Sequence, residues 1–147
     1  RYQVFLAVVD IDNFKEFNDT YGHQEGDGVL MALAEIFNEC TRTSVDMSFR
    51  IGGDEFAVLL PQTNADQATE IVQRILLKFI ERNLGKTTLS IGVVPCLRNR
   101  VLPLEIDERQ MRERGDQAMY EAKKKGKNCV VCRYAPPALI SSYPAHS

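Results

Sequence analysis

A run of six apolar, β-prone residues near the N-terminus constrains the fold more than any other feature of the sequence. Val4–Val9 contains no polar residue, which is the pattern of a central strand covered on both faces. The run is too short to cross a membrane or to form the apolar segment of a signal peptide. It ends abruptly in Asp10-Ile11-Asp12. The sequence therefore predicts two carboxylates at the C-terminal end of a buried strand.

The rest of the chain alternates helical and strand patterns in the order β-α-α-β-β-α-β-α-β. A polar helix is predicted over 13–21. A second helix is predicted after Gly22, Gly26 and Gly28, with Leu30, Leu33, Phe37 and Cys40 on one face. The remaining predicted segments are strands over 47–51 and 56–60, a helix after Asn64, a strand over 87–94, a helix over 107–125 and a strand over 129–133. Because crossover helices are combined with one antiparallel hairpin, the order predicts an α+β sandwich in which helices cover a mixed sheet.

The segment after Asn64 carries the clearest helical signal. Asn64 and Gln67 have the spacing of a capping box at its start. One face of the helix is apolar and consists of Ala68, Ile71, Val72, Ile75, Phe79 and Ile80. We expect this face to pack against the sheet.

Length and charge limit the possible functions. The chain has 147 residues, room for one domain of about 100–200 residues. We place this domain at 1–133, and the Pro-containing residues 134–147 have the pattern of a tail or linker. Lys and Arg number 18 against 20 Asp and Glu, a formal net charge of −2. A chain with this net charge has no positive electrostatic field that could hold nucleic acid or an anionic membrane. An anionic ligand therefore requires a local cationic cluster.

The cysteines and the first residue indicate the setting of the protein. Its 4 cysteines do not form the framework of a disulfide scaffold. Cys129 and Cys132 form one C-x-x-C pair, but residues three apart in a strand point to opposite faces, which disfavours a shared metal. We expect reduced structural thiols in a cytoplasmic protein. Because the chain begins at Arg1 and not at Met, we also expect it to be part of a longer protein.

Two pairs of acids occur where strands end or turn. Asp10 and Asp12 close the first strand, and Asp54 and Glu55 follow a glycine turn. If these strands are neighbours, their carboxylates converge near the backbone carbonyl of Ile11. Oxygen ligands of this kind suit Mg²⁺, which keeps waters and phosphates as the rest of its shell. Solvated capping acids are the alternative interpretation.

Three lysines have positions from which they could meet a phosphate. Lys15 lies in the first turn of the first predicted helix, where the free amides of Asn13, Phe14 and Lys15 favour anions. Lys123 and Lys127 surround a glycine at a helix C-terminus. There they could equally be charges that complement the negative end of the helix.

Two further groups of residues allow both a structural and a binding interpretation. Gly52 and Gly53 could form only a hairpin turn, or they could allow a ligand to approach the backbone closely. Asn18, His23 and Asp27 could be capping and surface residues, or they could line a base pocket. An ionised Asp accepts two hydrogens side by side, which matches the N1–H and amino edge of guanine and not adenine.

Residues 52–56 read GGDEF, and the chain resembles the GGDEF domain family of diguanylate cyclases. Four further segments carry the resemblance in the order typical of the family. They are Asp10-Ile11-Asp12-Asn13-Phe14-Lys15 through Asn18-Asp19, Tyr21-Gly22-His23 with Gly26-Asp27, Ser90-Ile91-Gly92-Val93, and Asp116–Lys123 with Gly126-Lys127-Asn128. The resemblance covers residues 3–133, and the D-x-L-T-G-L-x-N-R segment usual upstream in the family is missing.

The resemblance implies the fold of nucleotidyl cyclase and polymerase palm domains, a central, mixed but mainly antiparallel five-stranded sheet with flanking helices. It implies the condensation of two GTP into cyclic di-GMP with release of pyrophosphate. Carried over residue by residue, Asp10, the carbonyl of Ile11 and Asp54 would hold two Mg²⁺ ions, or Mn²⁺ in their place.

The same resemblance implies roles for the other residues. Asp54 would take the proton from the attacking 3′-hydroxyl, with Glu55 as an alternative base or second-metal ligand. Lys15 would neutralise the triphosphate during catalysis, together with Lys123 and Lys127. The implied substrate contacts are Asn13, Phe14, Lys15, Asn18, His23, Asp27, Gly52, Gly53, Lys123 and Lys127, with Asn18 and Asp27 at the guanine.

The resemblance also implies partners. One domain holds one GTP and the product needs two, so the catalyst is expected to be a homodimer, which need only form transiently. We expect a fused sensory or phosphodiesterase domain outside this chain, and no contact with nucleic acid or membrane.

The chain departs from the family pattern at two places. The inhibitory product site of the family is an R-x-x-D, and here Asp46 is in place while Thr43 stands where the Arg belongs and Arg42 comes one position early. We therefore expect this site to be degenerate. Lys127 replaces a more usual Arg, which keeps the charge and loses bidentate reach.

Two other functions stay open. A catalytically silent GTP-binding domain that regulates a fused or partner cyclic-di-GMP phosphodiesterase would bind the nucleotide without turnover. A cyclase with altered base choice is disfavoured because Asp27 keeps the carboxylate that matches guanine.

Overall fold

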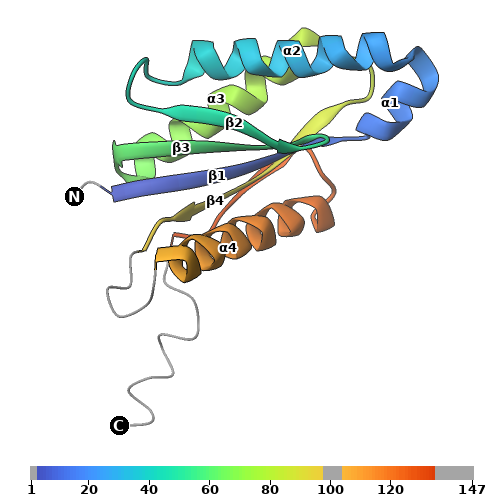
Figure 1. The fold of residues 1–147 in the computed structure, drawn as a ribbon. Helices are drawn as coiled ribbons and strands as arrows, with labels where there is room; N and C mark the ends of the chain where they lie inside the picture. The colour runs from blue at the N-terminus through green and yellow to red at the C-terminus, as the bar shows by residue number, and fades with distance from the viewer. Residues whose placement is uncertain (1–2, 98–103, 135–147) are drawn as a thin grey trace, which may run out of the picture.

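The computed structural model describes residues 3–97 and 104–134 (Figure 1). The elements in chain order are β1 (Gln3–Asp12), α1 (Phe14–Tyr21), α2 (His23–Cys40), β2 (Met47–Gly52), β3 (Glu55–Thr63), α3 (Ala65–Arg82), β4 (Thr88–Pro95), α4 (Leu104–Lys124) and β5 (Cys129–Cys132). The strands form one 5-stranded sheet in the order β2-β3-β1-β4-β5. All neighbours are antiparallel except β4 and β5, which are parallel. The predicted α+β sandwich with a mixed sheet is confirmed.

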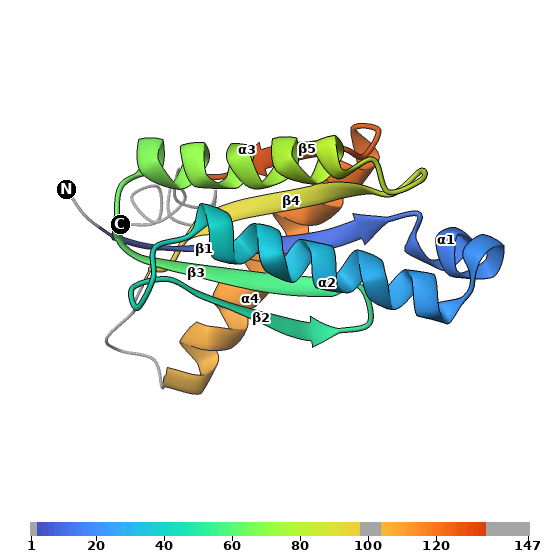
Figure 2. The ribbon, with the colours of Figure 1, turned by 90° about the horizontal axis from the view of Figure 1, so that it is seen from above.

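The sheet lies between two layers of helices. Helices α2 and α3 lie side by side over one face, and α4 crosses the other face (Figures 1 and 2). β1 is the central strand, and its residues alternate between the two cores. Phe5 and Ala7 pack beneath α2 and α3, whereas Leu6 and Val8 pack against α4. The prediction that this strand is covered on both faces is confirmed.

Helix α3 begins with the predicted capping box. The backbone N–H of Gln67 donates to Asn64 Oδ1 at 2.8 Å, and the backbone N–H of Asn64 donates to Gln67 Oε1 at 3.3 Å. The predicted apolar face is buried up to Phe79, but Ile80 is 44% exposed. The prediction is wrong for Ile80 because one residue turns the helix by about 100°, which carries this side chain onto the flank that faces solvent.

Helix α2 begins earlier than predicted. It starts at His23, directly after Gly22 with φ 93°, and runs through Gly26 and Gly28. A Cβ built on Gly26 would lie 1.7 Å from Asn18 Oδ1. The sequence reading assumed that this glycine precedes the helix. Instead it lies within the helix and allows α1 and α2 to approach each other closely.

The C-terminal strand places its two cysteines on opposite faces of the sheet, as predicted. Cys129 packs on the α4 side of the sheet and Cys132 on the α3 side, and all four cysteines are free thiols. Tyr134 still belongs to the packed domain, since its ring lies 5.2 Å from that of Phe5 and its hydroxyl lies 2.7 Å from Thr69 Oγ1. Pro136, Pro137 and Pro144, on which the tail prediction rests, lie outside the described residues. Within the described ranges, no helix is long and apolar enough to span a bilayer.

Replacing Gly92 by Ala is expected to destabilise the sandwich. A Cβ at this position of β4 would lie 2.2 Å from the Met119 backbone nitrogen in α4, so the helix must shift. We expect Gly92→Ala to lower the free energy of unfolding by about 2–3 kcal/mol in a urea titration followed by circular dichroism. Gly28→Ala is the matched control, because a Cβ there meets nothing within 4 Å. Stability of Gly92→Ala equal to that of the control would contradict the close packing of α4.

Candidate active site

The acids predicted to converge lie on neighbouring strands. Asp10 of β1 is the register partner of Glu55 in β3, and the Ile11 N–H donates to the Asp54 carbonyl at 3.1 Å. The carboxyl groups of Asp10 and Asp54 are near enough for Asp54 to raise the pKa of Asp10. The end of the central strand and the β2–β3 turn thus bring two carboxylates and the backbone of Ile11 to one place.

Burial changes the chemistry of Asp10. Its side chain is 15% exposed. Burial is the main reason why the pKa of Asp10 is raised to about 6; the charge of Asp54 raises it further, and Lys123 opposes the rise. A carboxylate pair of this kind is stabilised by any cation that comes between the two groups.

Lys123 of α4 already contacts this pair. Its ammonium lies 2.5 Å from Asp10 Oδ2 and 3.0 Å from Asp12 Oδ1. Burial works to lower the pKa of Lys123, but the two carboxylates outweigh it and the pKa is raised. Lys123 lies in the last turn of α4, as the sequence indicated, and the structure also pairs it with two acids of β1.

Asp12 was grouped by the sequence reading with the acids that could converge on Mg²⁺, but the family resemblance gave it no role. Its side chain is fully buried and accepts hydrogen bonds from Thr88 Oγ1 at 2.8 Å and Ser90 Oγ at 2.7 Å. It also accepts from Lys123 Nζ at 3.0 Å and from the Asn128 N–H at 3.1 Å. Burial alone would raise the pKa of Asp12, but these donors together lower it. The two-residue spacing from Asp10 was the available signal, because it places both acids on the α4 face of the sheet.

The predicted phosphate-binding segment starts at Asn13. This residue has φ 61° and precedes α1, so Phe14 and the exposed Lys15 are the first residues of the helix. Asn13 Nδ2 donates to the Lys86 carbonyl at 3.0 Å, and Lys127 Nζ donates to Asn13 Oδ1 at 3.0 Å. Lys127 is therefore held beside the N-terminus of α1, where free amides and the helix dipole favour an anion.

The three candidate base-binding residues lie at the junction of α1 and α2. His23 and Asp27 are exposed in the first turns of α2. Asn18 of α1 faces Gly26, and its Oδ1 is buried without a hydrogen-bond partner among the described residues. The structure therefore brings Asn18 and the start of α2 together.

Glu55 is held on the far side of the glycine turn. Gly52 and Gly53 are exposed, and Glu55 lies 3.6 Å from Arg112 and contacts Asp116, both on α4. Burial raises the pKa of Glu55, the neighbouring Asp116 adds to the rise, and Arg112 opposes it. Sequence spacing gave no signal for these two partners on α4.

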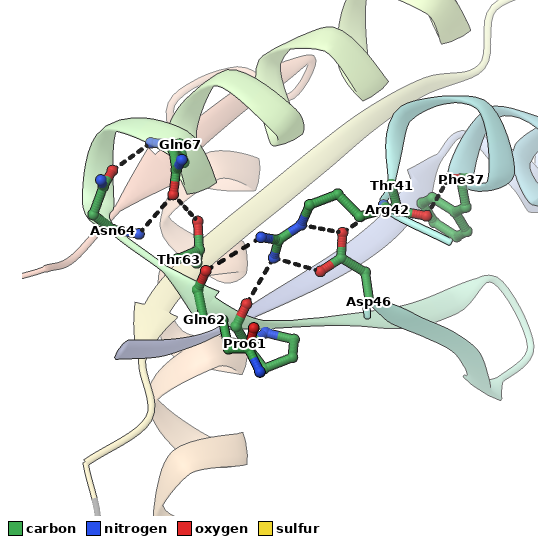
Figure 3. A network of polar contacts seen from close by, with 9 residues as sticks. All are labelled: Phe37, Thr41, Arg42, Asp46, Pro61, Gln62, Thr63, Asn64 and Gln67. Atoms are coloured by element: carbon green, nitrogen blue, oxygen red, sulfur yellow. Dashed lines mark hydrogen bonds and ion pairs between the residues drawn. The ribbon is translucent and has the colours of Figure 1, made fainter. Parts of the chain in front are cut away.

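Arg42 lies at the opposite end of β2 and β3, where its polar contacts help to hold the fold together (Figure 3). Its guanidinium pairs with both oxygens of the buried Asp46, at 2.7 Å for the shorter contact, and donates to the Pro61 and Gln62 carbonyls at 2.7 and 3.2 Å. Thr43 is exposed beside it. The off-register arginine is therefore used to fasten the α2–β2 loop to β3.

Comparison with protein families assigns residues 1–129 to the family described as "Diguanylate cyclase, GGDEF domain". The chain belongs to the GGDEF domain family. Diguanylate cyclase DgcM of Escherichia coli K12 is 41% identical over 129 residues, which cover 86% of this chain and 30% of DgcM. Diguanylate cyclase A of Treponema denticola is 40% identical over 131 residues, which cover 85% of this chain and 34% of the relative. The GGDEF chain thus spans about a third of the length of these curated relatives.

Solved GGDEF structures show the same fold. The coiled coil and GGDEF domain of DgcB from Caulobacter crescentus, in complex with c-di-GMP, superposes with a TM-score of 0.78 at 30% identity and covers 90% of this chain and 70% of that one. The active GGEEF domain of a diguanylate cyclase from Vibrio cholerae gives 0.77 at 30% identity, with 90% and 84% covered. The palm-like cyclase fold implied by the sequence is confirmed.

Removal of Arg42 is expected to destabilise the domain. Arg42→Ala leaves the buried carboxylate of Asp46 without its cation and the two β3 carbonyls without their donors. We expect the free energy of unfolding to fall by about 3–4 kcal/mol in a guanidinium chloride titration.

Arg82→Ala is the matched control, because its pairs with Glu35 and Glu39 are exposed and should contribute less than about 1 kcal/mol. Equal losses in the two variants would show that Arg42 is only another surface arginine.

Proposed function

We propose that this GGDEF domain condenses two GTP into cyclic di-GMP with release of pyrophosphate. The observation that carries the proposal is the convergence of Asp10 and Asp54 at the end of the central strand, with Lys123 against Asp10. The similarity to proteins named diguanylate cyclases supports the same reaction.

The donors present fit Mg²⁺ or Mn²⁺. Asp10, Asp54 and the Ile11 carbonyl are all oxygen ligands, and the mutual repulsion of the two carboxylates is relieved by a divalent cation. In the described part of the chain, no three His, Cys, Asp or Glu side chains form a group suited to a metal, so water and phosphate oxygens would complete the shell. Two such ions, when bound, would supply Lewis acidity for the phosphoryl transfer.

The residues of the chain would bind and orient GTP around this centre. Lys15 and the first amides of α1 would hold phosphate oxygens, with Lys127 beside them. Asn18 and Asp27 would bind the guanine edge, which fits the unpartnered Oδ1 of Asn18. His23 and the open Gly52–Gly53 turn would complete the substrate contacts.

Proton transfer is assigned to the acids of the turn. Asp54 would accept the proton of the attacking 3′-hydroxyl. Glu55 is the alternative base or second-metal ligand, and its raised pKa increases its proton affinity. Asp54 ends the turn and Glu55 begins β3 opposite Asp10, so both carboxylates come from the chain beside the end of β1.

The reaction needs two copies of the domain, because each would hold one GTP. We propose a two-fold homodimer that forms at least transiently. Relatives show how pairing or control is arranged elsewhere: DgcB carries a coiled coil, and SiaD of Pseudomonas aeruginosa was solved with its activator SiaC. We propose a comparable fused or bound regulatory partner for this chain.

The alternative is a silent GTP-binding domain that regulates a phosphodiesterase. An EAL/GGDEF domain protein of M. capsulatus resembles this chain with a TM-score of 0.69 at 33% identity, so the fold also occurs beside an EAL domain. The two functions differ in turnover and not in binding.

The decisive measurement is product formation from GTP and Mg²⁺, identified by mass. We expect the wild-type chain, dimerised through a fused coiled coil where needed, to form cyclic di-GMP. Asp54→Asn is expected to lower the rate at least about 100-fold, because it removes the base and a metal ligand.

Glu81→Gln, the same change on an exposed acid of α3, is the control and should keep full activity. Wild-type binding of GTP without turnover in the forced dimer would favour the silent domain. A chain that neither binds nor converts GTP would overturn both functions.

Base selection tests the pocket separately. Asp27→Ser removes the carboxylate that would accept two hydrogens from guanine. We expect the preference for GTP over ATP to fall at least about tenfold, since charge-assisted hydrogen bonds contribute about 1.5–3 kcal/mol. Glu25→Ser, another exposed acid of the first turn of α2, should leave the preference unchanged. An unchanged preference in Asp27→Ser would remove this residue from the guanine site.

A further inference from the structure

A buried carboxylate to which the proposed chemistry gives no role lies directly behind the site. Asp12 is 0% exposed, and its two oxygens accept four hydrogen bonds. Two of the donors are hydroxyls of β4, one is the Asn128 amide after α4, and one is the ammonium of Lys123. The last donor is the only one of the four that extends from the core into the candidate site, where it also contacts Asp10.

A purely structural role would not need this charge. Thr88, Ser90 and the Asn128 amide already join β1, β4 and the turn before β5. A lysine has a flexible four-carbon stem, so its ammonium is poorly placed unless partners hold it. Asp12 is such a partner, and being buried it cannot be withdrawn from Lys123 by solvent or by a ligand that binds at the surface.

We propose that Asp12 is a positioning residue that holds the Lys123 ammonium at the Asp10 end of β1, ready for the phosphates of the nucleotide. The proposal rests on the function proposed above and adds to it. Asp10 and Asp12 lie two residues apart on the same face of β1, and Lys123 bridges them. When Asp10 engages another cation, Asp12 keeps Lys123 in place instead of releasing it to solvent.

Through its hydrogen bond with Asn128, Asp12 also stabilises the neighbouring turn. Lys127 and Asn128, which follow Gly126, both have positive φ, at 67° and 53°, a strained backbone for residues with a side chain that is favoured by outside support. The bond from the Asn128 N–H to Asp12 supplies that support from the core. It fixes the residue next to Lys127, whose ammonium is bonded to Asn13 at the start of α1.

The test measures nucleotide binding without turnover. The probe is 3′-deoxy-GTP with Mg²⁺, which lacks the attacking hydroxyl, titrated by calorimetry into the full chain. We expect Asp12→Asn to weaken binding at least about tenfold and Lys123→Met to weaken it to a similar extent. The double variant should bind no more weakly than Lys123→Met alone, because the amide oxygen left by Asp12→Asn can still accept from the Asn128 N–H and the loss acts through Lys123. Effects that multiply in the double variant, or no effect of Lys123→Met, would overturn the proposal.

A control separates positioning from loss of stability. Thr63 is as buried as Asp12 and bonds to Gln67 at the far end of β3, so Thr63→Val should destabilise the domain but leave the affinity within about twofold. If Asp12→Asn does not fold, Lys123→Met is compared with the double variant, in which the buried pair is removed as a whole. A weaker double variant would overturn the proposal.

The proposed function and this inference can fail separately. A wild-type chain that binds 3′-deoxy-GTP but makes no cyclic di-GMP from GTP would refute the cyclase, while the binding cycle would still decide the role of Asp12. A wild-type chain that does not bind 3′-deoxy-GTP would overturn both.

Discussion

The hydrogen bonds to the buried Asp12 carboxylate join the core of this GGDEF domain to its candidate site. An unpaired carboxylate in this position would destabilise the fold by several kcal/mol, so its donors must all be in place when the chain folds. They come from β4, from α4 and from the turn before β5. The relative positions of these three elements are therefore fixed at the point where Asp10 reaches the surface.

The site is also a continuation of the packing of β1. The alternation that directs Leu6 and Val8 toward α4 also directs Asp10 and Asp12, the next two residues on that face of β1, toward α4. Gly92 allows α4 to lie close against the sheet at Met119. Lys123 follows Met119 by one helical turn, so the same close approach delivers its ammonium to the two acids.

Local patterns in the sequence were sufficient for most of the fold. The unbroken apolar run predicted the central strand, and the capping box predicted the start of α3, because both signals depend on neighbouring residues. The acid pair could be predicted because strand ends and turns are visible in the sequence. The partners of Lys123 could not, because 111 positions separate it from Asp12 and no local pattern records such a contact. Gly26 was misread for the same reason, since its role depends on Asn18 in another helix.

Arg42 shows how a shift of one position changes what a charged residue can do. A guanidinium has five N–H donors, and four of those of Arg42 are directed at Asp46, Pro61 and Gln62. An anionic ligand at this loop would have to compete with a buried carboxylate that is already bound in bidentate geometry. Any regulation through the α2–β2 loop would thus have to break contacts that hold the fold together. A ligand at the candidate site, near the other end of β3, would not have to break such contacts to reach Lys15 and Asp27, because both residues are exposed.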